Sequence, residues 1–163
     1  MSEKVPTTLA TRMLDEAGVA YVPRLYKYEN RGGTAVSSRE LGVSEHDVVK
    51  TLVMETDKHE PLIVLMHGDC EVSTKSLARL IGCKSIAPCR PDVAQKHTGY
   101  LVGGTSPFGT KRKMPVYLQK TVLDAARIYI NGGHRGFLIE LAPAEVVRLL
   151  EPTLVDVALP AGD

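Results

Sequence analysis

The strongest constraint on the fold is a pair of β-rich runs, DVVKTLVMET at 47–56 and PLIVLMHG at 61–68, separated by the polar residues DKHE. This pattern predicts a β-hairpin. Shorter β-prone runs are interspersed with helical patterns in no regular strand–helix–strand order, so we predict an α+β fold with a mixed, curved sheet in one domain, residues 1–163. The other predicted strands lie at 19–28, 84–88, 100–102, 115–119, 127–131, 137–141 and 153–158, and the predicted helices at 7–17, 37–42, 73–82, 91–99 and 142–150.

Local signals refine several of these elements. Pro23 predicts an edge strand or a bulge, because proline cannot donate to a β-ladder. Ser37 and Ser73 are predicted N-caps of the helices that follow them. The last residues, LPAGD at 159–163, are predicted to fray.

Composition narrows the class of protein. The chain has 163 residues and a net charge of +1, so any binding of nucleic acid needs a local basic patch rather than a global charge. Its N-terminus lacks the apolar core of a signal peptide, and no run approaches the roughly 18 apolar residues of a membrane span. Three cysteines do not make a secreted disulfide framework. We expect a soluble cytoplasmic protein with reduced thiols.

Two glycine clusters carry the first functional signal, LVGGTSPFG at 101–109 and GGHRG at 132–136. Each follows a β-prone run, and a strand that runs into paired glycines can expose backbone N–H groups to a developing oxyanion. Hairpin turns give the same pattern, so both interpretations stay open. The spacing matches neither the G-x-S-x-G elbow nor the P-loop.

A lysine and a basic run supply positive charge. Lys50 interrupts the apolar run at 47–56, either as a solvated edge residue or as a cation that holds a carbonyl or phosphate at the mouth of the sheet. Lys111, Arg112 and Lys113 directly follow the first glycine cluster. A basic collar beside backbone donors suits a phosphate-bearing substrate, although such runs are most often a solvated face.

Metal and thiol chemistry have weaker support. The residues of the zinc-ligand type are His67, Cys70, Cys83 and Cys89, but no C-x-x-C pair occurs among them. We therefore expect no metal and no other cofactor. A Cys–His nucleophile remains an alternative, because its members meet in space rather than in sequence.

Three segments in order, VVKTLV, AQKHTGYLVGGTSPFGTKRK and IYINGGHRGFLIEL, resemble the YbaK/ProX family of aminoacyl-tRNA deacylases, free-standing relatives of the editing domain in bacterial prolyl-tRNA synthetases. The resemblance runs from about Leu9 to Val157. It implies a mixed, partly barrel-like sheet surrounded by helices. It also implies hydrolysis of an amino acid wrongly esterified to the 3′ end of tRNA.

The resemblance also implies roles for single residues. Lys50 matches the family's functional lysine, and Gly103 and Gly104 match its glycine loop, so we expect these three to be catalytic. Asn131 and His134 depart from the commoner SGGKRG. The residues expected at the substrate are Tyr26, Thr51, Ser106, Pro107, Gly109, Asn131, Gly132, Gly133 and Arg135, and those expected at the tRNA backbone are Lys111, Arg112 and Lys113.

The similarity of HTGYLVGGTSPFG to the cysteine-specific branch implies trans-acting cleavage of Cys-tRNA(Pro) or Cys-tRNA(Cys), with the substrate thiol attacking its own ester. Alternatives are a bound water acting on another mischarged tRNA such as Ala-tRNA(Pro), and a binding module without catalysis. The expected partners are the acceptor end of mischarged tRNA and prolyl-tRNA synthetase. We expect no membrane association, and a monomer or weak dimer.

Overall fold

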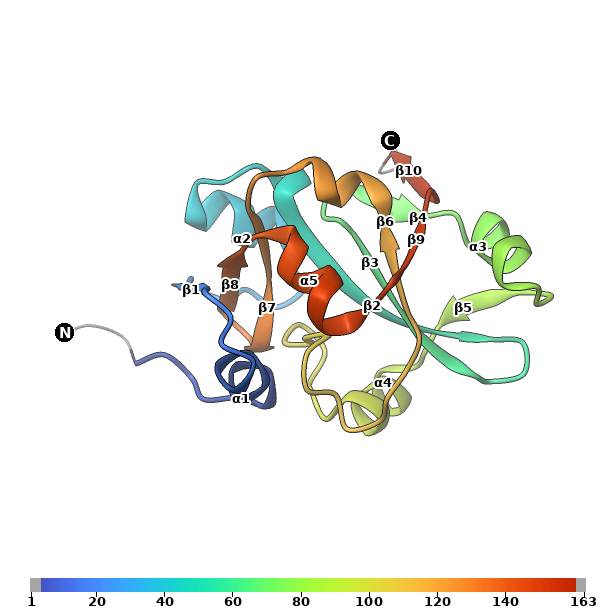
Figure 1. Ribbon diagram of the computed structural model, residues 1–163, viewed down its shortest axis with the longest axis horizontal. Coiled ribbons are helices and arrows are strands. Elements are labelled where there is room, and N and C mark those ends of the chain that lie inside the picture. The colour runs from blue at the N-terminus through green and yellow to red at the C-terminus, as the bar shows by residue number, and fades with distance from the viewer. Residues whose placement is uncertain (1–3, 161–163) are drawn as a thin grey trace.

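The computed structural model describes residues 4–160 and is organised around one mixed sheet (Figure 1). Within those residues the sheet has eight strands in the order β1-β8-β7-β2-β3-β6-β9, and β5 also pairs with β2. A separate two-stranded sheet joins β4 to β10. The strands are β1 (Val22–Leu25), β2 (Val48–Thr56), β3 (Pro61–His67), β4 (Cys70–Val72), β5 (Ile86–Pro88), β6 (Val116–Gln119), β7 (Ile128–His134), β8 (Phe137–Leu141), β9 (Thr153–Val155) and β10 (Ala158–Pro160).

The predicted hairpin forms the middle of the sheet. β2 and β3 pair antiparallel, from Val49 opposite His67 to Glu55 opposite Pro61. β2 is also parallel to β7, and β3 is parallel to β6, so parallel and antiparallel pairs are mixed as predicted. Pro23 lies in β1, at the edge of the sheet.

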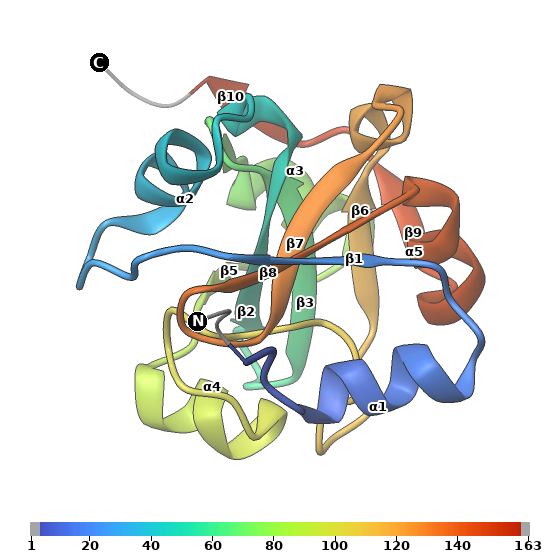
Figure 2. The same cartoon turned by 90° about the vertical axis from the view of Figure 1, so that its left-hand side faces the viewer.

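Helices cover both ends of the sheet. α1 and α4 lie at one end and α2 at the other (Figure 2). Ser73 caps α3 by accepting a hydrogen bond from the N–H of Ser76, as predicted. The helices are α1 (Leu9–Glu16), α2 (Gly33–Leu41), α3 (Thr74–Ile81), α4 (Pro91–Thr98) and α5 (Pro143–Leu150), with short 3-10 helices η1 (Glu45–Asp47) and η2 (Lys120–Asp124).

The two faces of the sheet bury separate apolar clusters, because side chains alternate along each strand. Val49 of β2 belongs to the cluster that includes Leu14 of α1 and Val146 of α5. Met54 of β2 belongs to the other cluster, which includes Leu77 of α3. No helix among residues 4–160 combines the length and apolar character that a bilayer crossing requires.

Four local predictions were wrong. Residues 100–102 form a turn without a partner strand, and Gly132 and Gly133 lie within β7 at a bulge rather than in the hairpin turn itself. α2 begins at Gly33, so Ser37 lies inside it and its hydroxyl donates to the carbonyl of Thr34. Leu159 and Pro160, which were predicted to fray, pair with the remote β4, whereas 161–163 fall outside the described residues.

Candidate active site

The site is built around a gap in the sheet along one edge of β2. β7 pairs with β2 only at Val48 and Val49, and β5 joins it only from Met54 onward. Residues 50–53 therefore have β3 on one side and no strand on the other. A sheet edge of this kind presents unpaired backbone groups.

The hydrogen bonds between β2 and β3 show which backbone groups of β2 face the gap. The N–H of Gly68 donates to the carbonyl of Val48, and the N–H of Thr56 donates to that of Glu60, so the even-numbered residues of β2 exchange bonds with β3. Odd-numbered residues turn their peptide groups the other way, as Val53 shows by accepting from the N–H of Cys89 at 3.0 Å. The peptide groups of Thr51 therefore face the gap.

A cavity of about 510 Å³ opens along this edge, a size suited to a small ligand. One wall comes from α2 and the segment before it, and the opposite wall from α4 and the first glycine loop. The cavity is lined by Tyr26, Tyr28, Glu29, Asn30, Arg31, Gly33, Thr34, Val36, Ser37, Val48, Val49, Lys50, Thr51, Leu52, Val53, Cys89, Pro91, Ala94, Val102, Gly103, Thr105, Asn131, Arg135 and Leu138.

Lys50 and Thr51 reach this cavity from opposite faces of β2. The Lys50 ammonium donates to the carbonyl of Cys70 at 2.5 Å. An ammonium has three donors, so two remain for a ligand. The Thr51 hydroxyl is buried and has no hydrogen-bond partner among residues 4–160. A buried orphan hydroxyl is costly, and because Thr51 lines the cavity, a polar ligand group could supply the missing partner.

The two glycine clusters meet beside the gap. Asn131 donates through Nδ2 to the carbonyl of Gly103 at 3.2 Å, and Arg135 donates through Nε to that of Val102 at 2.8 Å. A Cβ on Gly104 would lie 2.8 Å from the backbone nitrogen of Arg135, so only glycine permits this approach. The second cluster therefore positions the first.

The two predicted catalytic glycines differ in their backbone bonds. The N–H of Gly104 donates to the carbonyl of Leu101 at 2.9 Å and closes the turn. The N–H of Gly103 has no partner within residues 4–160, and Gly103 lines the cavity, whereas Gly104 is buried behind it. Gly103 is thus the glycine of the pair whose donor is free.

Several predicted substrate residues lie outside the cavity lining. Ser106 and Pro107 are buried, and the Ser106 hydroxyl accepts from the N–H of Phe108 at 3.2 Å. Gly109 packs against the backbone of Leu9, with no room for a Cβ. These residues hold the loop against α1 rather than touching the cavity.

Gly132 and Gly133 also lie behind the cavity. A Cβ at Gly132 would lie 2.4 Å from the Phe137 ring, and one at Gly133 would lie 2.7 Å from the Tyr100 ring. Both glycines therefore permit close packing in β7. Neither lines the cavity.

The basic run lies apart from the cavity. Lys111, Arg112 and Lys113 are exposed, and the first two run antiparallel to the end of α4, with their N–H groups on the carbonyls of Thr98 and His97. The cavity contacts the opposite end of that helix, and none of the three cations lines it.

The structure adds contacts that the sequence patterns did not reveal. Arg31 lines the cavity in a left-handed conformation, with φ of 61°, which is uncommon for a residue with a side chain. Tyr28 lines it as well, and the guanidinium of Arg135 lies 5.3 Å from the centre of its ring. No carboxylate within residues 4–160 forms an ion pair with either arginine, so neither positive charge is neutralised by a direct contact. Tyr26, one of the residues expected at the substrate, also lines the cavity.

The structure gives little support to a Cys–His nucleophile, or to a metal site built only from the histidine and cysteines named in the sequence analysis. Cys89 lines the cavity, but burial raises its pKa to about 11, with a further contribution from Glu55, so it is protonated at neutral pH and a poor nucleophile. His67 is buried, and both ring nitrogens are bonded, to the carbonyl of His46 and the hydroxyl of Thr121. Within residues 4–160, His67, Cys83 and Cys89 join no cluster of three ligand atoms, whereas Cys70 lies with two residues outside the predicted set, His46 and Asp69.

Comparisons with known proteins agree with one another. The profile of the aminoacyl-tRNA editing domain matches residues 30–149. The chain is 32% identical over 143 residues to EbsC of Enterococcus faecalis, a proposed Cys-tRNA(Pro)/Cys-tRNA(Cys) deacylase. The aligned region covers 87% of each protein. It is 40% identical over 67 residues to the proline–tRNA ligase of Syntrophotalea carbinolica, covering 41% of this chain and 12% of the ligase.

A solved structure shares the fold. The crystal structure of a proposed trans-editing enzyme for prolyl-tRNA synthetase matches with a TM-score of 0.81 at 21% identity, and the match covers 94% of this chain and 99% of that one. The predicted α+β architecture, a mixed sheet with surrounding helices, is therefore confirmed.

Proposed function

Because the chain belongs to the aminoacyl-tRNA editing domain family, we propose that it hydrolyses the ester of mischarged aminoacyl-tRNA in the cavity beside β2. The observation that carries this proposal is that Lys50, Thr51 and Gly103 all line one cavity, with donors of the Lys50 ammonium and the N–H of Gly103 free of partners among residues 4–160. An aminoacyl ester is already activated. Hydrolysis therefore needs mainly an oriented ester, a stabilised oxyanion and an attacking group.

Each of these residues then has a defined part. The N–H of Gly103 stabilises the oxyanion, since it is an uncommitted donor on a loop held by Asn131 and Arg135. The remaining donors of Lys50 hold the ester carbonyl or the nearest phosphate as a point charge. Thr51 contacts the aminoacyl group along the open edge of β2.

The charge of the mouth suits the 3′ end of tRNA. Arg31 and Arg135 stand at the cavity without carboxylate partners among the described residues, so they are available to the terminal phosphates. The basic run of Lys111, Arg112 and Lys113 lies beside the C-terminal end of α4, where it would meet the acceptor-stem backbone. Such contacts add affinity without reading sequence.

The preferred substrate in this proposal is Cys-tRNA(Pro), because a relative of 32% identity is named for cysteinyl-tRNA. The substrate thiol attacks its ester carbonyl, a C–S bond forms, and the bond to the ribose 3′-oxygen breaks. The thiol proton passes to that oxygen, and water then opens the cyclic thioester. A water-mediated reaction on Ala-tRNA(Pro) is the alternative. A synthetase partner remains part of the proposal, since the chain resembles part of a proline–tRNA ligase.

The test is a panel of tRNA(Pro) charged with cysteine, alanine, serine or proline, with deacylation followed for each. We expect cysteine to be released fastest, and serine much more slowly because a hydroxyl is a weaker nucleophile. Lys50→Ala should reduce the rate by about 10²–10³-fold with the fold intact by circular dichroism. Full activity of that variant would remove Lys50 from the mechanism, and binding without turnover of any ester would identify a binding module. Equal rates for serine and cysteine would exclude attack by the thiol.

A further inference from the structure

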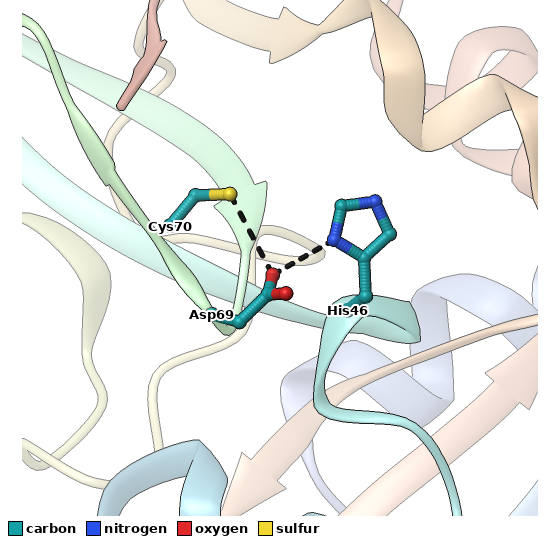
Figure 3. Close-up of side chains that lie close together, drawn as sticks. All are labelled: His46, Asp69 and Cys70. Atoms are coloured by element: carbon teal, nitrogen blue, oxygen red, sulfur yellow. Dashed lines mark hydrogen bonds and ion pairs between the residues drawn. The ribbon is translucent and has the colours of Figure 1, made fainter. Parts of the chain in front are cut away.

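A second cluster of reactive side chains lies next to the Lys50 anchor and is not used in the proposed reaction. His46, Asp69 and Cys70 converge at the junction of η1 with the turn between β3 and β4 (Figure 3). The Nδ1 of His46 lies 2.8 Å from Oδ1 of Asp69, and the Sγ of Cys70 lies 3.6 Å from the same oxygen. Their ligand atoms all lie within 4.8 Å of one another.

The His46 ring packs against a second histidine ring. The His46 ring stacks on that of His67, with centroids 3.7 Å apart and planes 10° from parallel. His67 is itself fixed, because its nitrogens bond to the carbonyl of His46 and to the hydroxyl of Thr121. The stack therefore limits the orientations that the His46 ring can adopt.

The ligand chemistry favours a borderline-soft divalent cation. Imidazole, carboxylate and thiolate are all zinc ligands, whereas magnesium and calcium prefer oxygen alone. A thiolate, a carboxylate and a neutral imidazole together carry two negative charges, which balance one divalent ion. His46 and Asp69 are 51% and 44% exposed, so an ion can enter from solvent.

We propose that His46, Asp69 and Cys70 form a three-ligand zinc site, with the fourth position open to water. On binding, the Cys70 thiol releases its proton to solvent and a Zn–S bond forms. The Nδ1 of His46 gives up its hydrogen while Nε2 takes one from water, so one proton is released in total. A carboxylate oxygen that now accepts two hydrogen bonds accepts the metal instead.

One of the three ligand-atom separations already matches what zinc requires. Bond lengths of about 2.0–2.3 Å in a tetrahedron place ligand atoms roughly 3.3–3.6 Å apart. The Asp69–Cys70 separation of 3.6 Å already meets this value, and the His46–Asp69 pair needs to open from 2.8 Å. His46 lies in the 3-10 helix η1 and Asp69 in the turn before β4, and both side chains are exposed, so they have room to make this shift.

The site also lies beside the proposed catalytic lysine. Cys70 supplies both the thiol of the cluster and the carbonyl to which Lys50 donates. A metal at Cys70 therefore fixes the residue that anchors the Lys50 ammonium. The metal site itself does not depend on the deacylase proposal.

The test is titration of the full chain with Co²⁺, whose thiolate charge-transfer band reports a cobalt–sulfur bond, followed by displacement with Zn²⁺. We expect one equivalent to give the band and Zn²⁺ to abolish it. Cys70→Ser should remove the band. His46→Phe, which preserves the ring stack on His67, should weaken binding at least about tenfold.

The matched controls are Cys83→Ser and Cys89→Ser, which should retain the band. No band in the unmodified chain would overturn the proposal, and so would a band that survives Cys70→Ser or disappears in either control. Zinc content of each variant, measured by mass spectrometry under native conditions, gives a second readout that is independent of catalysis.

Discussion

Asn131 donates through Nδ2 to the carbonyl of Gly103 at 3.2 Å, and so connects the bulge of β7 to the loop that lines the cavity. Its Oδ1 meanwhile accepts from the N–H groups of Gly133 and His134, at 2.7 and 3.2 Å. One side chain therefore fixes both its own bulge and the neighbouring loop. The resemblance had placed Asn131 at the substrate, and its bonds also give it a positioning role.

The first prediction separates the two contacts of Asn131, one with its own bulge and one with the Gly103 loop. Asn131→Ser retains an oxygen that can accept from the bulge, but it is too short to reach Gly103, whereas Asn131→Ala loses both contacts. We expect kcat for cysteinyl-tRNA to fall about tenfold in both variants, because the oxyanion donor is no longer held. We expect Tm to fall further in Asn131→Ala. Single-turnover deacylation and thermal unfolding measure the two effects, and an unchanged kcat in Asn131→Ser would contradict the positioning role.

The second prediction uses two glycines with nearly equal backbone angles. Gly103 has φ of 88° and Gly82, at the end of α3, has φ of 89°. Replacing either with alanine should cost about 1–2 kcal/mol of stability from the left-handed conformation. A Cβ at Gly103 would additionally lie 2.6 Å from the hydroxyl of Tyr28, whereas one at Gly82 meets nothing within 4 Å.

We therefore expect Gly103→Ala to lose most deacylation activity and Gly82→Ala to retain it at similar stability. Urea unfolding and deacylation rates of the two variants provide the comparison. Equal activity of the two variants would show that the Gly103 loop is not part of the site.

The sequence predicted the fold well because its main signals are local. Alternation and the polar spacer identify the β2–β3 hairpin, and Ser73 is a local cap. The gap beside β2 was not predictable, because it depends on where β7 and β5 stop pairing. The same holds for β10, whose partner at Cys70–Val72 is remote in the chain.

In the candidate site, too, some residues carry a local sequence signal and others are identified only by the tertiary structure. Lys50 and Gly103 stand out by residue type and neighbourhood, and the structure brings both to one cavity. Ser106 shares the glycine-loop motif but faces the protein interior, because the loop also has to dock on α1. Arg31 carries no periodic or motif signal, so only the tertiary structure identifies it.

The third prediction concerns acid stability. Glu140 accepts from Arg24 at 2.6 Å and from Arg127 at 3.1 Å. The hydrogen bond from Arg24 lowers the pKa of Glu140, helped by Arg127 and opposed by burial. A lowered folded pKa contributes stability above the unfolded value of about 4.3, and this is lost as the pH falls through the folded pKa.

We expect Glu140→Gln to reduce the free energy of unfolding by about 1 kcal/mol at pH 7, a modest value because both arginines are partly exposed. The difference from the unmodified chain should shrink below about pH 4, where the carboxyl is protonated. Urea unfolding at both pH values is the measurement. Glu16→Gln, at an exposed residue of α1 without an ion pair among residues 4–160, is the control; a deficit of Glu140→Gln that stays constant with pH would rule out the ion pair as its cause.

The fourth prediction tests the orphan hydroxyl of Thr51 against one that is satisfied. Thr98 is fully buried, and its hydroxyl donates to the carbonyl of Ala94 at 2.8 Å and accepts from the N–H of Tyr100 at 3.1 Å. Thr98→Val should therefore lose about 1–2 kcal/mol of stability. Thr51→Val removes a buried group without a partner among the described residues, so it should leave stability unchanged or raise it by up to about 1 kcal/mol.

Deacylation should respond in the opposite way. If Thr51 contacts the aminoacyl group, Thr51→Val should release cysteine from tRNA several-fold more slowly although the protein is no less stable, since the substrate then loses a hydrogen-bond partner. Thr98→Val, at a residue that does not itself line the cavity, should deacylate at the normal rate while folded. Unfolding in urea and single-turnover deacylation of both variants decide the matter: a Thr51→Val protein that is both destabilised and fully active would show that this hydroxyl supports the fold and not the substrate.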